Sequence, residues 1–266
     1  LENPIDRELL LREKKEKARE ILHDRGINDE RIDEAWALLN ENYFLRHRVK
    51  EITWHTEWLT DSDPESAIGL IDVRRRTTGD GIEAVLYTPR QQRTFAHATA
   101  VLDELGMTII DARIVPLDND RSFVTLVFME QDARVESDET RINKVRRALT
   151  RILTAPSGKV LSVTRGRPRQ ARMFTTPTTV EFGLTAAGDQ TMLELQAADR
   201  PGLLSTIGQV FIEQGIDIEA AKIVTIGEKA EDVFYVCRES GGALDAAAQQ
   251  KLGDALLERL GSGKEE

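Results

Sequence analysis

The sequence has few residues of the kinds that form covalent cross-links or metal sites. Its 266 residues include one cysteine, Cys237, and four histidines. A single cysteine excludes an internal disulfide framework, so we expect a reducing compartment, the cytoplasm. Cys237 ends the apolar run 233–237 and is expected to pack in the core.

Long apolar runs and excess positive charge are also missing. No stretch of about 18 apolar residues occurs, so no membrane contact is expected. The net charge of −10 opposes nucleic-acid binding. The basic stretch 165–172 is interpreted as a solvated linker, with a phosphate or acidic-partner contact as the alternative. The chain begins with Leu1 rather than Met, and we expect a piece of a longer protein.

Catalytic motifs are absent as well. We find no glycine-rich phosphate loop and no supported Ser/His/Asp or Cys/His arrangement. His23-Asp24 lacks the further ligands of a metal-dependent hydrolase and is interpreted as the polar end of a helix. His47 and His55 are interpreted as packed or capping residues, with ligand or base roles as the alternative. We therefore predict no catalytic residue, no metal site and no cofactor in this chain.

The first sixty residues have the periodicity of helices. Asn3-Pro4 is a typical helix start and Gly26 a typical stop. A second helix is expected from Asn28 onward and a third over 49–59. Trp36, Trp54 and Trp58 are expected to pack between these helices.

From about residue 70 the sequence repeats with a shift of 109 residues and, as aligned here, no gap. Gly106 falls on Gly215, and Ile109 on Ile218. Each copy has a strand, a second strand, a helix, two strands and a helix. The expected ranges are 68–75, 82–87, 94–105, 107–116, 122–130 and 139–153 in the first copy, and 178–185, 191–198, 203–214, 216–226, 231–238 and 245–260 in the second.

This order predicts an α+β chain with two tandem ferredoxin-like βαββαβ domains behind an α-helical segment. A strand at 159–163 would close the first copy. The second copy has no such strand, so we expect its open edge to be covered, for example by the strand near Val180. The predicted domains are 1–66 (helical), 67–164 (first copy), 165–176 (linker) and 177–266 (second copy).

One turn of the second copy has the chemistry of a ligand site: Asp199, Arg200, Pro201, Gly202, Leu203 and Leu204. Pro201 fixes the chain direction, and Gly202 allows close approach of the backbone. The first amides of the following helix are suited to a carboxylate, and Asp199 to an ammonium group. Asp217, before Ile218, could face the same crevice. The alternative is that Asp199 only caps the helix and Pro-Gly only makes the turn.

The segment Asp199–Leu204 followed by Gly215-Ile216-Asp217-Ile218 resembles an ACT domain, a regulatory module that binds amino acids at interfaces between modules. The segments 43–47, 52–56, 87–89 and 177–182 extend the resemblance. Together they are similar to the C-terminal region of the bifunctional PII uridylyltransferase/uridylyl-removing enzymes.

This resemblance implies a glutamine-sensing regulatory fragment in the control of nitrogen metabolism. The parent enzyme would contain a nucleotidyltransferase domain, presumed to use Mg2+, and an HD-type hydrolase domain, and would act on the PII protein. Glutamine would bind at an ACT–ACT pair. The first copy has Arg93 where the second has Gly202, so we expect it to bind differently, if it binds at all.

Three alternatives remain at this stage. The chain could itself hydrolyse nucleotidyl groups. It could be an ACT-type interaction module without a ligand. It could also belong to another ACT-bearing enzyme, against which the segments 52–56 and 177–182 argue.

Overall fold

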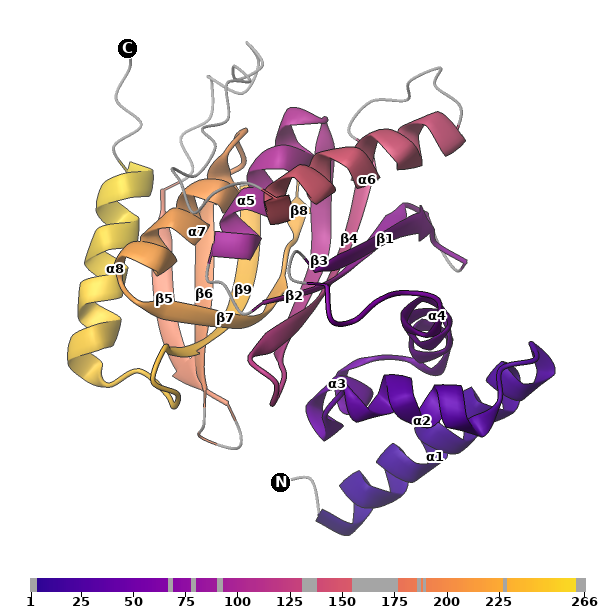
Figure 1. The fold of residues 1–266 in the computed structure, drawn as a ribbon. Helices are drawn as coiled ribbons and strands as arrows, with labels where there is room; N and C mark the ends of the chain where they lie inside the picture. The colour runs from indigo at the N-terminus through magenta and orange to yellow at the C-terminus, as the bar shows by residue number, and fades with distance from the viewer. Residues whose placement is uncertain are drawn as a thin grey trace. The chain divides into compact units, whose positions relative to one another are not determined.

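Four helices open the chain. The computed structural model describes residues 4–66, 69–77, 80–89, 93–130, 138–154, 177–185, 188, 190–226 and 229–261. The helices are α1 (Pro4–Asp24), α2 (Asp29–Ala37), α3 (Glu41–Arg46) and α4 (Val49–Thr60) (Figure 1). Gly26 adopts φ 83°, and Ile27 N–H returns to Leu22 O at 3.0 Å, which ends α1 as predicted.

The short helix α3 was missed by the sequence analysis. Its six residues make fewer than two turns, too few for a clear apolar period. Asn40 begins it, because its side-chain oxygen accepts a hydrogen bond from Tyr43 N at 3.1 Å. Lys14 of α1 ends it, since its ammonium donates to the carbonyls of Phe44, Leu45 and His47 at 3.0, 2.7 and 2.9 Å.

Two copies of one arrangement follow, as the sequence predicted. The first copy consists of β1 (Leu70–Arg75), β2 (Ile82–Pro89), α5 (Arg93–Glu104), β3 (Met107–Pro116), β4 (Arg121–Glu130) and α6 (Asp138–Thr154). The second consists of β5 (Thr179–Leu184), β6 (Thr191–Ala198), α7 (Leu203–Glu213), β7 (Ile216–Lys222), β8 (Thr225–Ile226), β9 (Lys229–Arg238) and α8 (Ala246–Gly261).

The ungapped 109-residue shift is wrong in the last two elements of each copy. It holds for β2 and β6, and for the starts of β3 and β7, at 107 and 216. The starts of β4 and β9, at 121 and 229, differ by 108, and so do those of α6 and α8. The hairpin before β9, which contains β8, therefore changes the register by one residue. A one-residue change exchanges the two faces of a strand.

The strands are paired in the order β1-β2-β4-β3-β7-β9-β6-β5, with β8 beside β9. The expectation for the second copy is confirmed, because β5 covers the edge of β6 in an antiparallel pair from Thr179↔Gln196 to Leu184↔Thr191. In the first copy β1 takes the same place beside β2. The strand expected at 159–163 and the linker 165–176 lie outside the described residues.

The two copies meet edge to edge and helix to helix. Antiparallel pairing of β3 with β7 joins Asp111, Ala112 and Arg113 to Lys222, Ala221 and Ala220. Helices α5 and α7 pack side by side (Figure 1). A Cβ atom at Gly208 of α7 would lie 2.8 Å from Ala96 Cβ of α5, so the helices approach closely because position 208 has no side chain.

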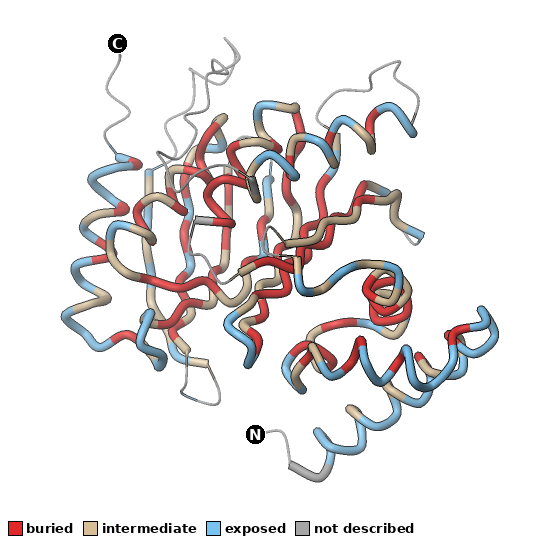
Figure 2. The backbone as a smooth tube through the Cα atoms, viewed as in Figure 1, coloured by how far each residue is buried: buried red, intermediate tan, exposed pale blue. Residues whose placement is uncertain are grey.

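Contacts divide the described chain into two units. One contains residues 1–72 with the strand segments 85–90 and 115–124, and the other contains the remaining residues. The core of the first unit includes Trp36 and Trp54, as predicted, together with Tyr43, Phe44 and Phe123. In the second unit the strands β6 and β9 alternate between buried and more exposed residues (Figure 2).

Candidate functional site

The candidate bend links β6 to α7 in the second unit. Gly202 is the N-cap of α7 and has φ 81°, a left-handed conformation that glycine adopts without strain. Leu203 N–H donates to Arg200 O at 3.1 Å, which closes the turn. Gly202 O accepts from Thr206 N at 2.9 Å and from the hydroxyl of Thr206 at 2.7 Å. The six residues therefore form a hydrogen-bonded turn at the start of a helix.

The bend is already bonded to the other copy. Gly202 N–H donates to the carboxylate of Asp103, which lies on α5. Gly202 has no side chain of its own to cap α7, so Asp103 supplies an anion at a helix N-terminus. The first amides of this helix were predicted to bind a ligand carboxylate, but in the structure the amides of Gly202 and Leu203 both have partners within the chain. The packing of α5 beside α7 brings Asp103 there, and no local pattern in the sequence indicated it.

A second carboxyl group lies near Asp199, and the sequence analysis missed it. Asp232 on β9 is 1% exposed. Its Oδ1 accepts from Val224 N at 3.3 Å, while Oδ2 has no hydrogen-bond partner among the described residues. Burial raises the pKa of Asp232 to about 7; the bond from Val224 opposes this shift and the negative charge of Asp199 adds to it.

The pKa of Asp199 is also raised. Partial loss of hydration raises its pKa above the usual value, and a hydrogen bond from the backbone of Arg200 opposes the shift. The two carboxyl groups are close enough for Asp199 to act on Asp232 through its charge. Two acids with raised pKa values beside one helix start mark this bend as a candidate functional site.

Asp217 does not join this pair. It lies opposite Cys237 in the pairing of β7 with β9, while Ile218 lies opposite Val236. Residues opposite each other share a face of the sheet, and neighbours along a strand point to opposite faces. Ile218 therefore shares the face of Val236 and Asp232, and Asp217 points to the other face. The register argues against a place for Asp217 in the same crevice, and its role there stays a prediction.

The first copy has no equivalent acid pair. Under the 108-residue offset of β4 and β9, Asp232 corresponds to Val124, which is buried. Gly202 corresponds to Arg93 and Asp199 to Arg90 under the 109-residue shift. Arg90 and the side chain of Arg93 lie outside the described residues.

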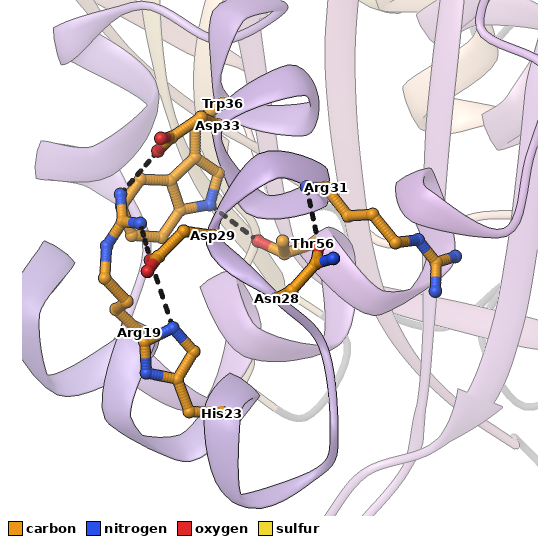
Figure 3. Close-up of polar contacts among 8 residues, drawn as sticks. All are labelled: Arg19, His23, Asn28, Asp29, Arg31, Asp33, Trp36 and Thr56. Carbon is orange, nitrogen blue, oxygen red and sulfur yellow. Dashed lines mark hydrogen bonds and ion pairs between the residues drawn. The ribbon is translucent and has the colours of Figure 1, made fainter.

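The histidines of the helical segment have structural contacts. His23 Nε2 lies 3.0 Å from Asp29 Oδ1, and Arg19 binds both Asp29 and Asp33 (Figure 3). His55 Nδ1 lies 2.7 Å from the hydroxyl of Tyr43. His47 Nδ1 donates to Tyr43 O at 2.7 Å, because a carbonyl oxygen can only accept. His47 and His55 are buried and packed, as predicted, and His23 lies in the last turn of α1 as expected.

Among the described residues, no group of three or more His, Cys, Asp or Glu side chains is arranged to hold a metal ion. None of the helices in that part of the chain combines the length and the apolar character needed to cross a membrane. The buried Cys237 matches its expected place in the core.

Comparison with known proteins gives two segment-specific matches. Residues 6–58 match the family described as the uridylyltransferase GlnD fifth domain, and residues 191–254 match the ACT domain family. A solved structure, aspartate kinase from Synechocystis, aligns with 69% of this chain and 28% of its own at 13% identity, with a TM-score of 0.40.

Over nearly its whole length, the chain is similar to the bifunctional enzymes described below. The chain is 32% identical over 264 residues to the bifunctional uridylyltransferase/uridylyl-removing enzyme of Pseudomonas fluorescens, which covers 98% of this chain and 29% of that protein. It is 31% identical over 268 residues to the same enzyme of Pseudomonas entomophila, covering 99% and 30%. The chain thus spans about 30% of the length of these relatives. It belongs to the family of ACT-bearing C-terminal regions of the bifunctional uridylyltransferase/uridylyl-removing enzymes.

Proposed function

We propose that this chain is the glutamine-sensing part of such an enzyme and that the second copy holds the sensor site. The observation that carries the proposal is the position of the bend. It combines a helix start, two acids with raised pKa values and a bond to the neighbouring copy through Asp103. An amino acid that binds there would contact both copies.

The chemistry of the bend fits a zwitterion. A ligand carboxylate is suited to the Gly202 amide, where the Asp103 carboxylate is now. A ligand ammonium is suited to the acid at Asp199. Binding would then exchange an internal carboxylate for one from the ligand and would release Asp103 from the bend.

This exchange would couple ligand binding to the packing of the two copies. A ligand shifts a conformational equilibrium only by its difference in affinity between two states. Here Asp103 is bonded to Gly202 in one state, and this bond is broken in the other. A coupling of about 1–3 kcal/mol between glutamine and the packing of the two copies would be ordinary.

The remainder of the proposal concerns the parent enzyme. By the family resemblance, the parent enzyme would transfer UMP to the PII protein and remove it again. It would act in the cytoplasm, and its catalytic domains would use Mg2+. Glutamine at the ACT pair would select between these activities.

Calorimetry with glutamine tests the sensor. We expect saturable heat with glutamine and none with glutarate, which has a similar carboxylate but no ammonium group. The matched variants are Asp199→Asn, which should weaken binding, and Asp61→Asn, which removes an exposed carboxylate in the other unit and should not. Silence with glutamine at millimolar concentration would refute the proposal.

A second function is favoured by one observation. Because Asp103 already caps Gly202, the ACT pair is complete without a ligand and can act as a docking module for PII or a second subunit. A pull-down of PII that glutamine does not change, from a chain that is silent in calorimetry, would support this function instead.

A further inference from the structure

Asp232 is a buried acid in largely apolar surroundings. It lies on the strand face that carries Ala230, Phe234 and Val236, all buried. One carboxyl oxygen has a long hydrogen bond from Val224, and the other has no partner among the described residues. An apolar residue of similar volume would fill the same space without the cost of burying an acid. The second carboxyl oxygen is therefore a candidate contact for a ligand.

Among the described residues, no cation is recorded as acting on Asp232. From β6, Leu195 lies opposite Asp232, and from the bend Asp199 adds negative charge. The buried residues of α7 are apolar or small, including Leu203, Ser205 and Ile207. Helix α5, whose Phe95 contacts Phe234 on the same face, carries the buried His97, which has an interaction of its own. Lys229 is paired with Glu231.

We propose that Asp232 receives the α-ammonium group of the bound amino acid, with Asp199 as the outer partner of the same group. The inference rests on the proposed sensor function and names the residue that selects an amine. A primary ammonium group has three donors, which suits the free oxygen of Asp232 and a carboxylate at Asp199. The ligand reaches Asp232 when release of Asp103 lets the bend open.

A proton balance follows from this assignment. With a pKa of about 7, Asp232 is largely protonated at pH 6 in the unliganded chain. Binding of an ammonium group favours the ionised form, so the proton leaves to solvent as the ion pair forms. The apparent affinity should therefore fall about tenfold for each pH unit below 7 and level off above 8.

Calorimetry at pH 6, 7 and 8, in buffers with different ionisation enthalpies, measures both the affinity and the protons released. For the unmodified chain we expect nearly one proton released per glutamine at pH 6 and almost none at pH 8. N-acetylglutamine, which lacks the ammonium group, should not bind.

Two variants test whether Asp232 is the group that binds the ammonium and releases the proton. Asp232→Asn keeps the size of the side chain and removes its charge, and we expect glutamine binding at least about 30-fold weaker with no proton release. Glu231→Gln removes a carboxylate from the adjacent residue of β9, which points to the opposite face, and should bind as the unmodified chain does.

The outcomes separate the two proposals. Absence of glutamine binding at every pH overturns both. Binding without proton release at pH 6 in the unmodified chain overturns this inference and leaves the sensor function standing. Equal glutamine affinities for Asp232→Asn and the unmodified chain would likewise overturn this inference and leave the sensor function standing. The proton count needs no variant, so it decides even if Asp232→Asn folds poorly.

Discussion

At the scale of single residues, burial of Asp232 should make the stability of the unliganded chain depend on pH. The folded chain holds this proton to a pKa of about 7, whereas an unfolded chain releases it near 3.8. Between these values the folded state binds more protons, so its free energy of unfolding falls as pH rises and then becomes constant. A shift of this size corresponds to a loss on the order of 4 kcal/mol.

The measurement is a comparison of unfolding temperatures from pH 4.5 to 8 for the unmodified chain and Asp232→Asn. The variant carries no titrating group at this position, so it should be increasingly more stable than the unmodified chain as pH rises. The difference should be smallest near pH 4.5. Glu231→Gln serves as the control. A constant difference across this range would mean that Asp232 does not titrate as described.

The contrast between Asp199 and Asp232 shows what sequence reasoning can find in a site. Asp199 belongs to a continuous run with proline and glycine, and such a run has a known backbone geometry. Asp232 and Asp103 are distant from that run in the chain, and only the pairing of β6 with β9 and the packing of α5 beside α7 bring them to it. The available signal was an acid on the buried face of an alternating strand, Ala230-Glu231-Asp232-Val233-Phe234.

At the scale of helices, the contact of α5 with α7 depends on the absence of a side chain at position 208. A Cβ there would lie 2.8 Å from Ala96 Cβ and 2.9 Å from Ala96 Cα, so the helices would have to separate. We expect Gly208→Ala to destabilise the chain by about 1–3 kcal/mol in chemical denaturation. The matched variant is Gly253→Ala in α8, where the nearest atom is the ring of Phe182 at 3.4 Å.

Gly253→Ala should be neutral or stabilising by about 0.5–1 kcal/mol, because alanine favours a helix more than glycine does. Both variants make the same chemical change in helices of the same copy. If they had equal effects, the close approach of α5 and α7 would not be a determinant of stability.

The Asp103 contact gives a prediction for the same pair of helices. Asp103→Ala removes the carboxylate from the start of α7, and we expect a loss of about 1 kcal/mol. The same variant should bind glutamine more tightly, because the ligand no longer competes with an internal carboxylate. Asp103→Asn keeps an oxygen that can cap the helix, and it should lose less stability. Weaker glutamine binding by Asp103→Ala would show that Asp103 holds the ligand instead of competing with it.

The elements themselves were largely predictable. The strands and helices of both copies follow from alternating and helical periods and from glycine stops such as Gly106 and Gly215, each with positive φ. The six-residue α3 was missed, because Lys14 and Asn40 determine its ends rather than its own period. The register change before β9 was missed too, since alternating sequences align almost equally well after a one-residue slip.

At the scale of the whole molecule, the two copies share a fold but differ at the positions that would bind an amino acid. Val124 replaces the acid at 232, and Arg93 replaces the glycine at 202. An apolar residue cannot pair with an ammonium group, and a residue with a Cβ does not readily adopt the left-handed conformation of Gly202. Under the proposed function, the repeat would therefore supply one amino-acid site for each chain, although it supplies two ACT-like folds.

Calorimetric titration of glutamine into this chain should accordingly saturate at one ligand per chain. The number of bound ligands is informative because it depends on where the sites lie. One site in each copy would give two ligands per chain, and a site shared between two chains would give one for each pair of chains. Asp232→Asn should remove the single site. Val124→Ala, at the corresponding position of the first copy, should leave the count at one, with a stability loss of about 1–2 kcal/mol for the shortened core side chain. A count of two in the unmodified chain would mean that the first copy binds glutamine through groups other than those that define the bend at Gly202.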